Sequence, residues 1–277
     1  YSIVPDPTGT LSCAHTVSQL TQLVPVTFVH EFQHMISFNQ HFLVRGGFPE
    51  DLWLNEGLSH YAEEHGGRTF LPDSATFCNY VFGDLYNSGQ YLGAPQHHFL
   101  VDTAGIGGLA ERGAYWLFVR YLVDQFSTDT TVAAQNAFTR TLEATTLIGE
   151  DNVSAATGTT FATLVERWAL ANYVSDLSGF SAPPELKYVS WDFRTADSVF
   201  NANCSSKIPA RFPLDTAARV FAGSALAASG TLHAGSGSYY VLQQGAGQGQ
   251  FSLLFSNAAG AALRTSLVPR LTVIRLQ

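Results

Sequence analysis

The spacing of hydrophobic and polar positions changes near residue 180 of this chain. Before that point, apolar residues recur three and four positions apart, which is the pattern of helices that bury one face. The pattern is clear over residues 25–39, where Pro25 suits the first turn of a helix. A second segment, 49–65, starts with a proline and ends at two glycines. We expect further helices over residues 74–86, 109–126, 131–144 and 160–174.

After residue 184 the segments become short, rich in β-branched and aromatic residues, and separated by Gly, Ala and Ser. Such segments are typical of strands joined by turns. The expected strands cover residues 188–193, 218–221, 238–243, 250–255 and 271–276. Together the two patterns predict an α+β protein, with a mostly helical domain over residues 1–180 and a small antiparallel β-sandwich over residues 185–277.

Composition excludes several classes of protein. Of the 277 residues, 46% are hydrophobic and 13% are charged, so the chain can bury a large core and is not a disordered protein. The net charge is −8 and the 14 Lys and Arg residues form no cluster, which argues against nucleic acid as a partner. No apolar run reaches the roughly 18 residues of a membrane-spanning helix, so we expect no transmembrane segment. Scarce Lys with abundant Thr, Ser, Gly and Tyr favours an exported protein, which is secreted, periplasmic or at the cell surface.

The three cysteines, Cys13, Cys78 and Cys204, allow at most one disulfide within the chain and leave one residue over. Their spacing matches no zinc-ribbon or C-x-x-C motif, so we expect them to be structural. The histidines carry more information, because eight of the nine lie before residue 99. Any catalytic site therefore belongs in the first third of the chain.

His30-Glu31-Phe32-Gln33-His34 is an H-E-x-x-H motif on the first expected helix. Residues i and i+4 lie one turn apart on the same face, so the two imidazoles can converge on one metal ion. Glu31 projects close by, where its carboxylate can accept a proton from water without filling a ligand position. His30 and His34 are therefore candidate metal ligands, and Glu31 is a candidate general base.

The third ligand decides the subclass of such a site. The extended metzincin pattern requires Gly at position 37 and His at position 40, where this chain has Ser37 and Gln40. The alternative is a Glu on a second helix, and the motif W-L-N-E-G supplies it as Glu56. Glu56 follows His34 by 22 positions, which leaves a loop at residues 41–48 for the second helix to fold back beside the first.

The motifs around these residues resemble those of the gluzincin metallopeptidases. The stretch from Thr27 to Glu64 is most similar to the hyicolysin family, and more distantly to thermolysin and the aminopeptidase N family. A looser likeness covers residues 113–118, 124–125 and 268–273. The resemblance implies that the helical domain has the zincin-like fold of these peptidases.

The resemblance also implies roles for the residues of the motif. It implies one Zn²⁺ per chain, held by His30, His34 and Glu56, with Glu31 as general base and acid. The implied function is hydrolysis of peptide bonds. The aminopeptidases carry a G-x-M-E-N motif ahead of the first His that grips a free amine, and the matching region, residues 1–6, is unlike it. We therefore expect a zinc-dependent endopeptidase that acts on a peptide or protein substrate.

The residue that supports a zinc-ligating histidine differs among the relatives. Thermolysin has an Asp four positions after the ligand Glu, where this chain has His60. The aminopeptidase pattern has Tyr and Glu five and seven positions on, which Tyr61 and Glu63 match. Glu63 lies on the same helical face as Glu56, so we expect Glu63 to support a zinc-bound His. Its neighbour Glu64 points about 100° away, and we expect it to be solvated.

The sequence leaves several candidates for the group that stabilises the tetrahedral intermediate. In the aminopeptidases a Tyr immediately precedes Glu-Lys-Gly, and the residue at that place, before Glu111-Arg112-Gly113, is Ala110. Tyr115, about one helical turn on, is our candidate catalytic residue for this role. The alternatives are the Arg112 cation and three residues of the preceding segment, namely Tyr91, His97 and His98.

The relatives carry a β-rich lobe ahead of the zinc-binding helix, and we expect this N-terminal β-lobe to be largely absent from the chain. Residues 1–4 would form the strand at the edge of the cleft that pairs with an extended substrate. The absent lobe, or another protein, is then an expected partner. The alternative function is a non-catalytic structural or partner-binding subunit that retains a metallopeptidase fold. An intact Glu31 favours the enzyme, because a scaffold has no chemical need for that carboxylate.

Overall fold

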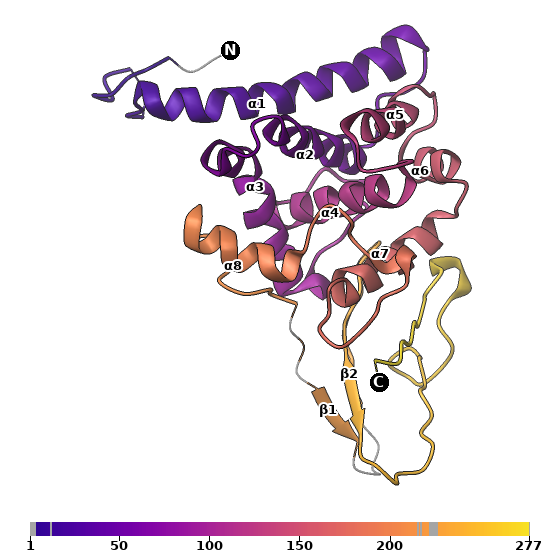
Figure 1. Ribbon diagram of the computed structural model, residues 1–277. Helices are drawn as coiled ribbons and strands as arrows, with labels where there is room; N and C mark the ends of the chain where they lie inside the picture. Colours follow the sequence, from indigo (N-terminus) through magenta and orange to yellow (C-terminus); the bar gives the residue numbers. More distant parts are fainter. Residues whose placement is uncertain (1–3, 12, 215, 217, 222–226, 277) are drawn as a thin grey trace.

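The structure is a computed structural model that describes residues 4–11, 13–214, 216, 218–221 and 227–276, so most of the edge strand expected at residues 1–4 lies outside the described residues. The chain is mostly helical (Figure 1). Its α-helices are α1 (Val17–Phe38), α2 (Leu52–Arg68), α3 (Ser74–Gly93), α4 (Leu109–Phe126), α5 (Val132–Glu143), α6 (Gly149–Thr157), α7 (Phe161–Val174) and α8 (Phe193–Asn203). The other elements are the π-helix η1 (Asn39–Val44), the 3-10 helices η2 (Pro95–His97), η3 (Pro184–Leu186) and η4 (Thr265–Leu267), and the strands β1 (Ala218–Phe221) and β2 (Val241–Gln244).

All six helices expected from the hydrophobic spacing are confirmed, with differences at their ends. The largest difference is at α1, which begins at Val17, so Pro25 lies inside the helix and not in its first turn. The start is fixed by Thr16, whose hydroxyl accepts a hydrogen bond from the backbone N–H of Gln19. The Gln19 side chain in turn accepts one from the backbone N–H of Thr16. This reciprocal cap begins the helix well before the apolar pattern becomes clear.

Helix α4 forms the centre of the core and packs against both α2 and α3. Its side chains from Ala114 to Val123 are buried. Helix α2 comes so close to α4 that a Cβ on Gly57 would lie 2.8 Å from the backbone oxygen of Tyr115, an approach that only glycine permits. This close packing fixes the neighbouring residue, Glu56, beside the first turns of α4.

Helix α1 lies across one side of this core and is exposed along most of its length (Figure 1). Its buried residues are His30 and Ser37, and the helix packs mainly on α2. Its outward face is apolar, because Phe28, Phe32 and Met35 are exposed by 62%, 48% and 65%. Helix α1 therefore turns His30 toward the core and an apolar stripe toward solvent.

The segment at residues 188–193 was predicted to be a strand, and this prediction is wrong. The segment is irregular and leads into α8, which begins after Asp192. The Asp192 side chain accepts a hydrogen bond from the backbone N–H of Thr195, and this cap outweighs the β-propensity of the preceding residues. A disulfide between Cys78 and Cys204 joins the end of α8 to α3.

The prediction of an antiparallel β-sandwich is also wrong within the described residues. They contain one sheet of two strands, in which β1 and β2 pair in parallel with Ala218 opposite Val241. The segments at residues 250–255 and 271–276 form no strand. Short apolar segments between turns indicate extended backbone, but they do not encode the partner or direction of a strand. The broad α+β class is confirmed, and helix is the dominant element.

One hydrophobic core spans the boundary expected near residues 180–185. Tyr188, Trp191 and Leu214 bury their side chains in the same cluster as residues of α2 to α7. The division into domains 1–180 and 185–277 stays a prediction, and α8 with the chain up to Leu214 packs on the helical part. Within the described residues, no helix is both long and apolar enough to pass through a membrane.

Candidate metal centre

Three side chains from α1 and α2 converge at the buried face of α1. The Nε2 atoms of His30 and His34 lie 3.1 Å apart, one helical turn from each other on α1. Glu56 reaches them from α2, with Oε2 at 3.5 Å from Nε2 of His30 and Oε1 at 3.8 Å from Nε2 of His34. The sequence-predicted metal ligands therefore do come together, and their ligand atoms lie within 4.8 Å of one another.

The spacing of these atoms fits a metal ion. Ligand atoms held tetrahedrally at 2.0–2.1 Å from zinc lie about 3.4 Å apart, which is in the middle of the three separations seen here. In addition, Oε2 of Glu56 is buried and has no hydrogen-bond partner. A buried carboxylate oxygen without a hydrogen bond is costly unless a cation satisfies it. Two imidazoles and one carboxylate are a donor set typical of zinc.

The other ring nitrogens fix the two imidazoles in the form that binds a metal. Nδ1 of His30 donates to Oε1 of Glu63 at 2.6 Å. Nδ1 of His34 donates to Oδ1 of Asn55 at 3.0 Å and also lies 3.2 Å from the hydroxyl of Ser59. In the neutral form that carries its proton on Nδ1, each ring turns the lone pair of its Nε2 toward the centre of the group.

The charges of the group depend on one another. Burial lowers the pKa of His30, but the Glu56 and Glu63 carboxylates outweigh it and raise this pKa to about 8. Burial raises the pKa of Glu56, but His30 and the Arg112 cation hold it at about 2. Glu56 is thus an anion across the ordinary pH range, as a metal ligand must be.

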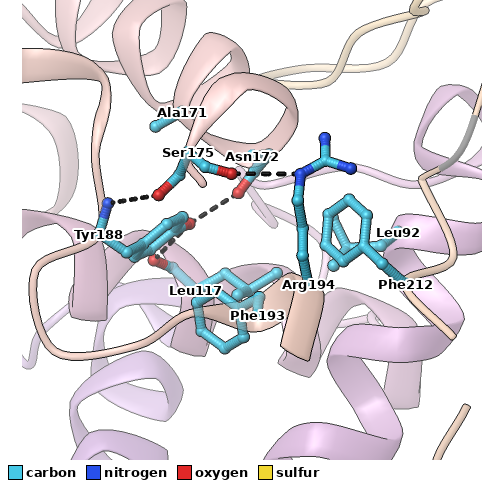
Figure 2. Close-up of a pocket in the computed structure, with 9 residues that line it drawn as sticks. All are labelled: Leu92, Leu117, Ala171, Asn172, Ser175, Tyr188, Phe193, Arg194 and Phe212. Carbon is cyan, nitrogen blue, oxygen red and sulfur yellow. Dashed lines mark hydrogen bonds between the residues drawn. The ribbon is translucent and has the colours of Figure 1, made fainter. Parts of the chain in front are cut away.

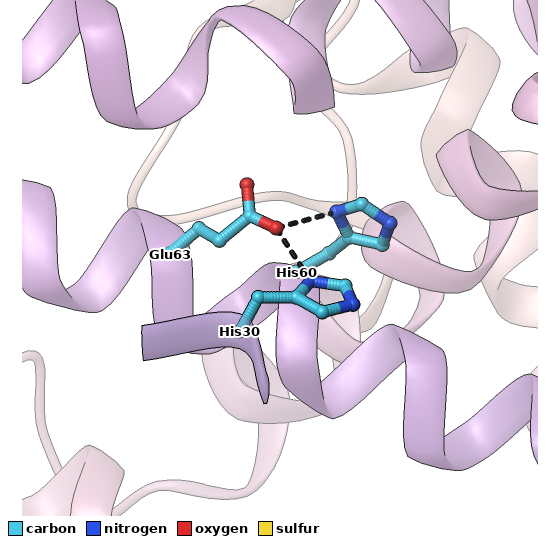
Figure 3. A group of neighbouring side chains, drawn as sticks. All are labelled: His30, His60 and Glu63. Carbon is cyan, nitrogen blue, oxygen red and sulfur yellow. Dashed lines mark hydrogen bonds and ion pairs between the residues drawn. The ribbon is translucent and has the colours of Figure 1, made fainter. Parts of the chain in front are cut away.

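A second group with the residue types of a metal site is made of His30, His60 and Glu63, and it shares His30 with the first group (Figure 3). Nδ1 of His60 lies 3.2 Å from Oε1 of Glu63 and 3.0 Å from Oδ1 of Asp84 on α3. The 2.6 Å contact between His30 and Glu63 has the length of a hydrogen bond, and it is too short for two atoms that ligate one zinc ion, which lie about 3.4 Å apart. Burial opposes the charge on His60, but Asp84 and Glu63 raise its pKa to about 10. The group therefore links α1, α2 and α3 behind His30.

Glu31 lies on α1 next to His30 and is exposed. Its carboxylate stands outside the three-ligand group. Among the described residues, no hydrogen bond or ion pair engages this carboxylate. Glu31 is therefore free to accept a proton from a molecule that enters from solvent.

Tyr115 and Arg112 both lie on α4, but they face different neighbours. The Tyr115 side chain is buried, and its hydroxyl lies 3.4 Å from Oδ2 of Asp102. Burial and the Asp102 carboxylate raise the pKa of Tyr115. Nη2 of Arg112, in contrast, lies 3.5 Å from Oε1 of Glu56, and the Arg112 side chain is 41% exposed. Arg112 thus contacts a metal-ligand candidate and solvent at the same time.

The expectation that Glu64 is solvated is wrong. Its side chain is fully buried and pairs with Arg120 at 3.2 Å and Arg68 at 2.7 Å. The indole N–H groups of Trp116 and Trp191 also donate to it. The helical angle of Glu64 was correct, but the angle alone does not say whether another helix covers that side of α2.

Three of the residues that surround the ligands were not predicted from the sequence. Asn55 precedes Glu56 in the W-L-N-E-G motif, and its position one turn before Ser59 on α2 could have suggested a common partner on α1. Asp84 lies on α3, and nothing in the local sequence links it to His60. Only the packing of α3 on α2 brings these two together.

Two hollows lie away from the ligand group. The smaller, about 10 Å³ and lined by side chains such as Asn172, Tyr188 and Arg194, is large enough for one water at most (Figure 2). Hydrogen bonds across it, such as that of Tyr188 Oη to Asn172 Oδ1 at 2.6 Å, tie α7 to the segment before α8. The larger, about 630 Å³, lies between α1, α2 and α5, and none of the three ligands lines it. The convergent His and Glu side chains are the stronger candidate for chemistry.

Comparisons of the chain with models of known protein families, with curated proteins and with solved structures found no match.

Proposed function

We propose that the chain is a zinc-dependent endopeptidase. The observation that carries the proposal is the convergence of His30, His34 and Glu56, whose ligand atoms lie 3.1–3.8 Å apart while both Nδ1 atoms are engaged elsewhere. This donor set and its spacing favour zinc over the oxygen-seeking cations magnesium and calcium. The resemblance to gluzincins in the sequence around these residues supports the same conclusion.

The residues around the group have distinct roles in the proposed reaction. Zinc, when bound, acts as a Lewis acid that polarises the scissile carbonyl and lowers the pKa of water at the site. Glu31 accepts the proton of the attacking water and later donates it to the nitrogen of the leaving amine. Glu63 and Asn55 hold His30 and His34 in the tautomer that the metal needs. Glu31 is exposed, so a substrate can approach it from solvent.

The proposed substrates are exported or extracellular proteins, which the chain cleaves at internal peptide bonds. Residues 1–6, at the place of the amine-gripping motif of the aminopeptidases, are unlike that motif, which favours an endopeptidase over an aminopeptidase. The disulfide between Cys78 and Cys204 supports a secreted, periplasmic or cell-surface protein, because disulfides persist in oxidising compartments.

The second candidate is a non-catalytic subunit that binds a protein partner. It is favoured by the exposed apolar stripe of α1, where Phe28, Phe32 and Met35 face solvent. Patches of this kind on a protein surface often mark an interface. The two candidates differ in their need for Glu31, because partner binding through this stripe does not depend on a proton acceptor.

The test is cleavage of unfolded casein by the 277-residue chain and by its Glu31→Gln variant, both assayed at the same measured zinc content. We expect the wild-type chain to cut internal bonds, a chelator to stop it, and the variant to lose activity by at least a hundredfold while its zinc content stays the same. The matched control is Glu185→Gln, which changes an exposed glutamate outside the centre. Equal activity of wild type and Glu31→Gln would contradict the proposed mechanism, and no cleavage by zinc-loaded wild type would favour the partner-binding subunit.

A further inference from the structure

A peptidase of this kind needs a group that stabilises the negative charge on the carbonyl oxygen when water attacks. The position that relatives fill with Tyr is Ala110, which is buried and has no polar side-chain atom. Tyr115 is 2% exposed, and its hydroxyl faces Asp102. Tyr91 is stacked in the core, and His98 pairs with a carboxylate on α4 at 2.7 Å. These side chains are engaged away from the ligand group.

Arg112 is placed differently. Its Nη2 atom lies 3.5 Å from Oε1 of Glu56, at the edge of the ligand group, and the side chain is 41% exposed. Among the described residues, no other Lys or Arg side chain has a salt bridge or hydrogen bond to His30, His34 or Glu56. A guanidinium carries its charge at every ordinary pH and presents five N–H donors, so it can serve an oxyanion without a proton transfer.

The contact with Glu56 does not lock Arg112 in place. It involves one nitrogen at 3.5 Å, not the paired geometry of a strong guanidinium–carboxylate bridge. Glu56 is buried, but the Arg112 side chain is 41% exposed, so solvent screens the pair in part. Because one nitrogen makes the contact with Glu56, the other N–H donors of the guanidinium can serve a substrate oxygen, while its attachment to α4 keeps it beside the ligand group.

We propose that Arg112 is the catalytic residue that stabilises the tetrahedral intermediate, a role that rests on the proposed peptidase function. The oxygen of water bonds to the carbonyl carbon, one proton of water passes to Glu31, and the carbonyl π pair moves onto the carbonyl oxygen. Arg112 donates hydrogen bonds to that oxygen. When the carbonyl re-forms, the C–N bond breaks and the proton held by Glu31 passes to the leaving nitrogen.

The test compares Arg112→Gln with wild type in the full 277-residue chain, with zinc measured in each sample. We expect kcat per bound zinc to fall by about a hundredfold or more with KM changed less than threefold, because the oxyanion forms only in the transition state. A second readout is calorimetric binding of a phosphinic analogue of the casein bond that wild type cleaves fastest. Its tetrahedral anion mimics the intermediate, so its affinity should fall by a comparable factor, while zinc stoichiometry stays unchanged.

Control variants separate a catalytic role from a structural one. Arg140→Gln removes an exposed arginine of α5 and should leave kcat and analogue binding as in wild type. Arg112→Lys retains the charge but loses the planar fork, so kcat should fall by about tenfold, and this variant carries the test if Arg112→Gln does not fold.

Three results would overturn the role of Arg112. In the first, Arg112→Gln loses zinc but keeps the wild-type kcat per bound zinc, which makes the residue structural. In the second, Tyr115→Phe loses a hundredfold in kcat while Arg112→Gln does not. In the third, zinc-loaded wild type cleaves no bond in casein, and the proposed function then fails as well. The first two results leave the peptidase function intact. Failure of the role of Arg112 can therefore be distinguished from failure of the proposed function.

Discussion

Nδ1 of His30 on α1 lies 2.6 Å from Oε1 of Glu63 on α2, and the same carboxylate oxygen lies 3.2 Å from Nδ1 of His60. Glu63 therefore fixes the proton of His30 on the nitrogen that points away from the other two ligand candidates. The carboxylate is held in turn by His60, which Asp84 contacts from α3 at 3.0 Å. The orientation of a metal-ligand candidate thus depends on three helices that are far apart in sequence.

Replacing Glu63 by Gln should weaken zinc binding by about 10- to 100-fold, which is the usual cost of losing a carboxylate behind a ligating histidine. The amide can still accept a hydrogen bond, but it no longer raises the basicity of His30. Competition with a chromogenic zinc chelator measures the change. Glu185→Gln, an exposed substitution outside the centre, should leave the affinity unchanged. Wild-type affinity in Glu63→Gln would show that the contact does not support a ligand.

Replacing Glu64 by Gln should destabilise the fold by about 3–5 kcal/mol, because the fully buried Arg120 loses one of its two carboxylate partners. The zinc affinity should change much less than in Glu63→Gln, since Glu64 does not contact the ligand group. Urea denaturation of the zinc-free chain measures the free energy of unfolding. A loss below 1 kcal/mol would mean that Asp124 alone satisfies the arginine.

Asp197 gives the chain a pH dependence that is independent of zinc. It is 2% exposed on α8, and burial alone raises its pKa to about 7. Because the folded pKa is above the ordinary value of 3.8, the stability due to the protonated form is fully present below pH 4 and is lost as pH rises through 7. Asp197→Asn should therefore stabilise the chain at pH 8 by a few kcal/mol and have little effect at pH 4. Thermal unfolding at the two pH values measures the effect of the substitution on stability. An equal effect at both would show that the ionisation of buried Asp197 is not its cause.

The local parts of the fold and site could be predicted from the sequence. His30 and His34 are one turn apart on one helix, so their convergence follows from helical geometry. The contact of Glu63 with His30 followed from the face that Glu63 shares with Glu56 on α2. The six confirmed helices likewise follow from spacing within single segments.

The parts that depend on contacts between distant segments could not be predicted. Asp84 reaches His60 only because α3 packs on α2, and Glu64 is buried only because α4 covers it. The β-sandwich failed for the same reason, since the sequence of a short strand does not say which segment lies beside it. Pro25 was misplaced because a cap at Thr16 starts α1 at Val17, eight residues before the start expected at Pro25.

The zinc content of the purified chain shows whether His30, His34 and Glu56 form a metal site. Elemental analysis compares wild type, which has all three ligand candidates, with His34→Ala and Glu56→Gln, which each lack one. All three proteins are first dialysed against the same trace of zinc. We expect one zinc per wild-type chain and a large loss in both variants. His233→Ala, which changes a histidine outside the group, should bind as much zinc as wild type. A well-folded wild-type chain that binds no zinc, or ligand variants that bind as much as wild type, would contradict the proposed metal site.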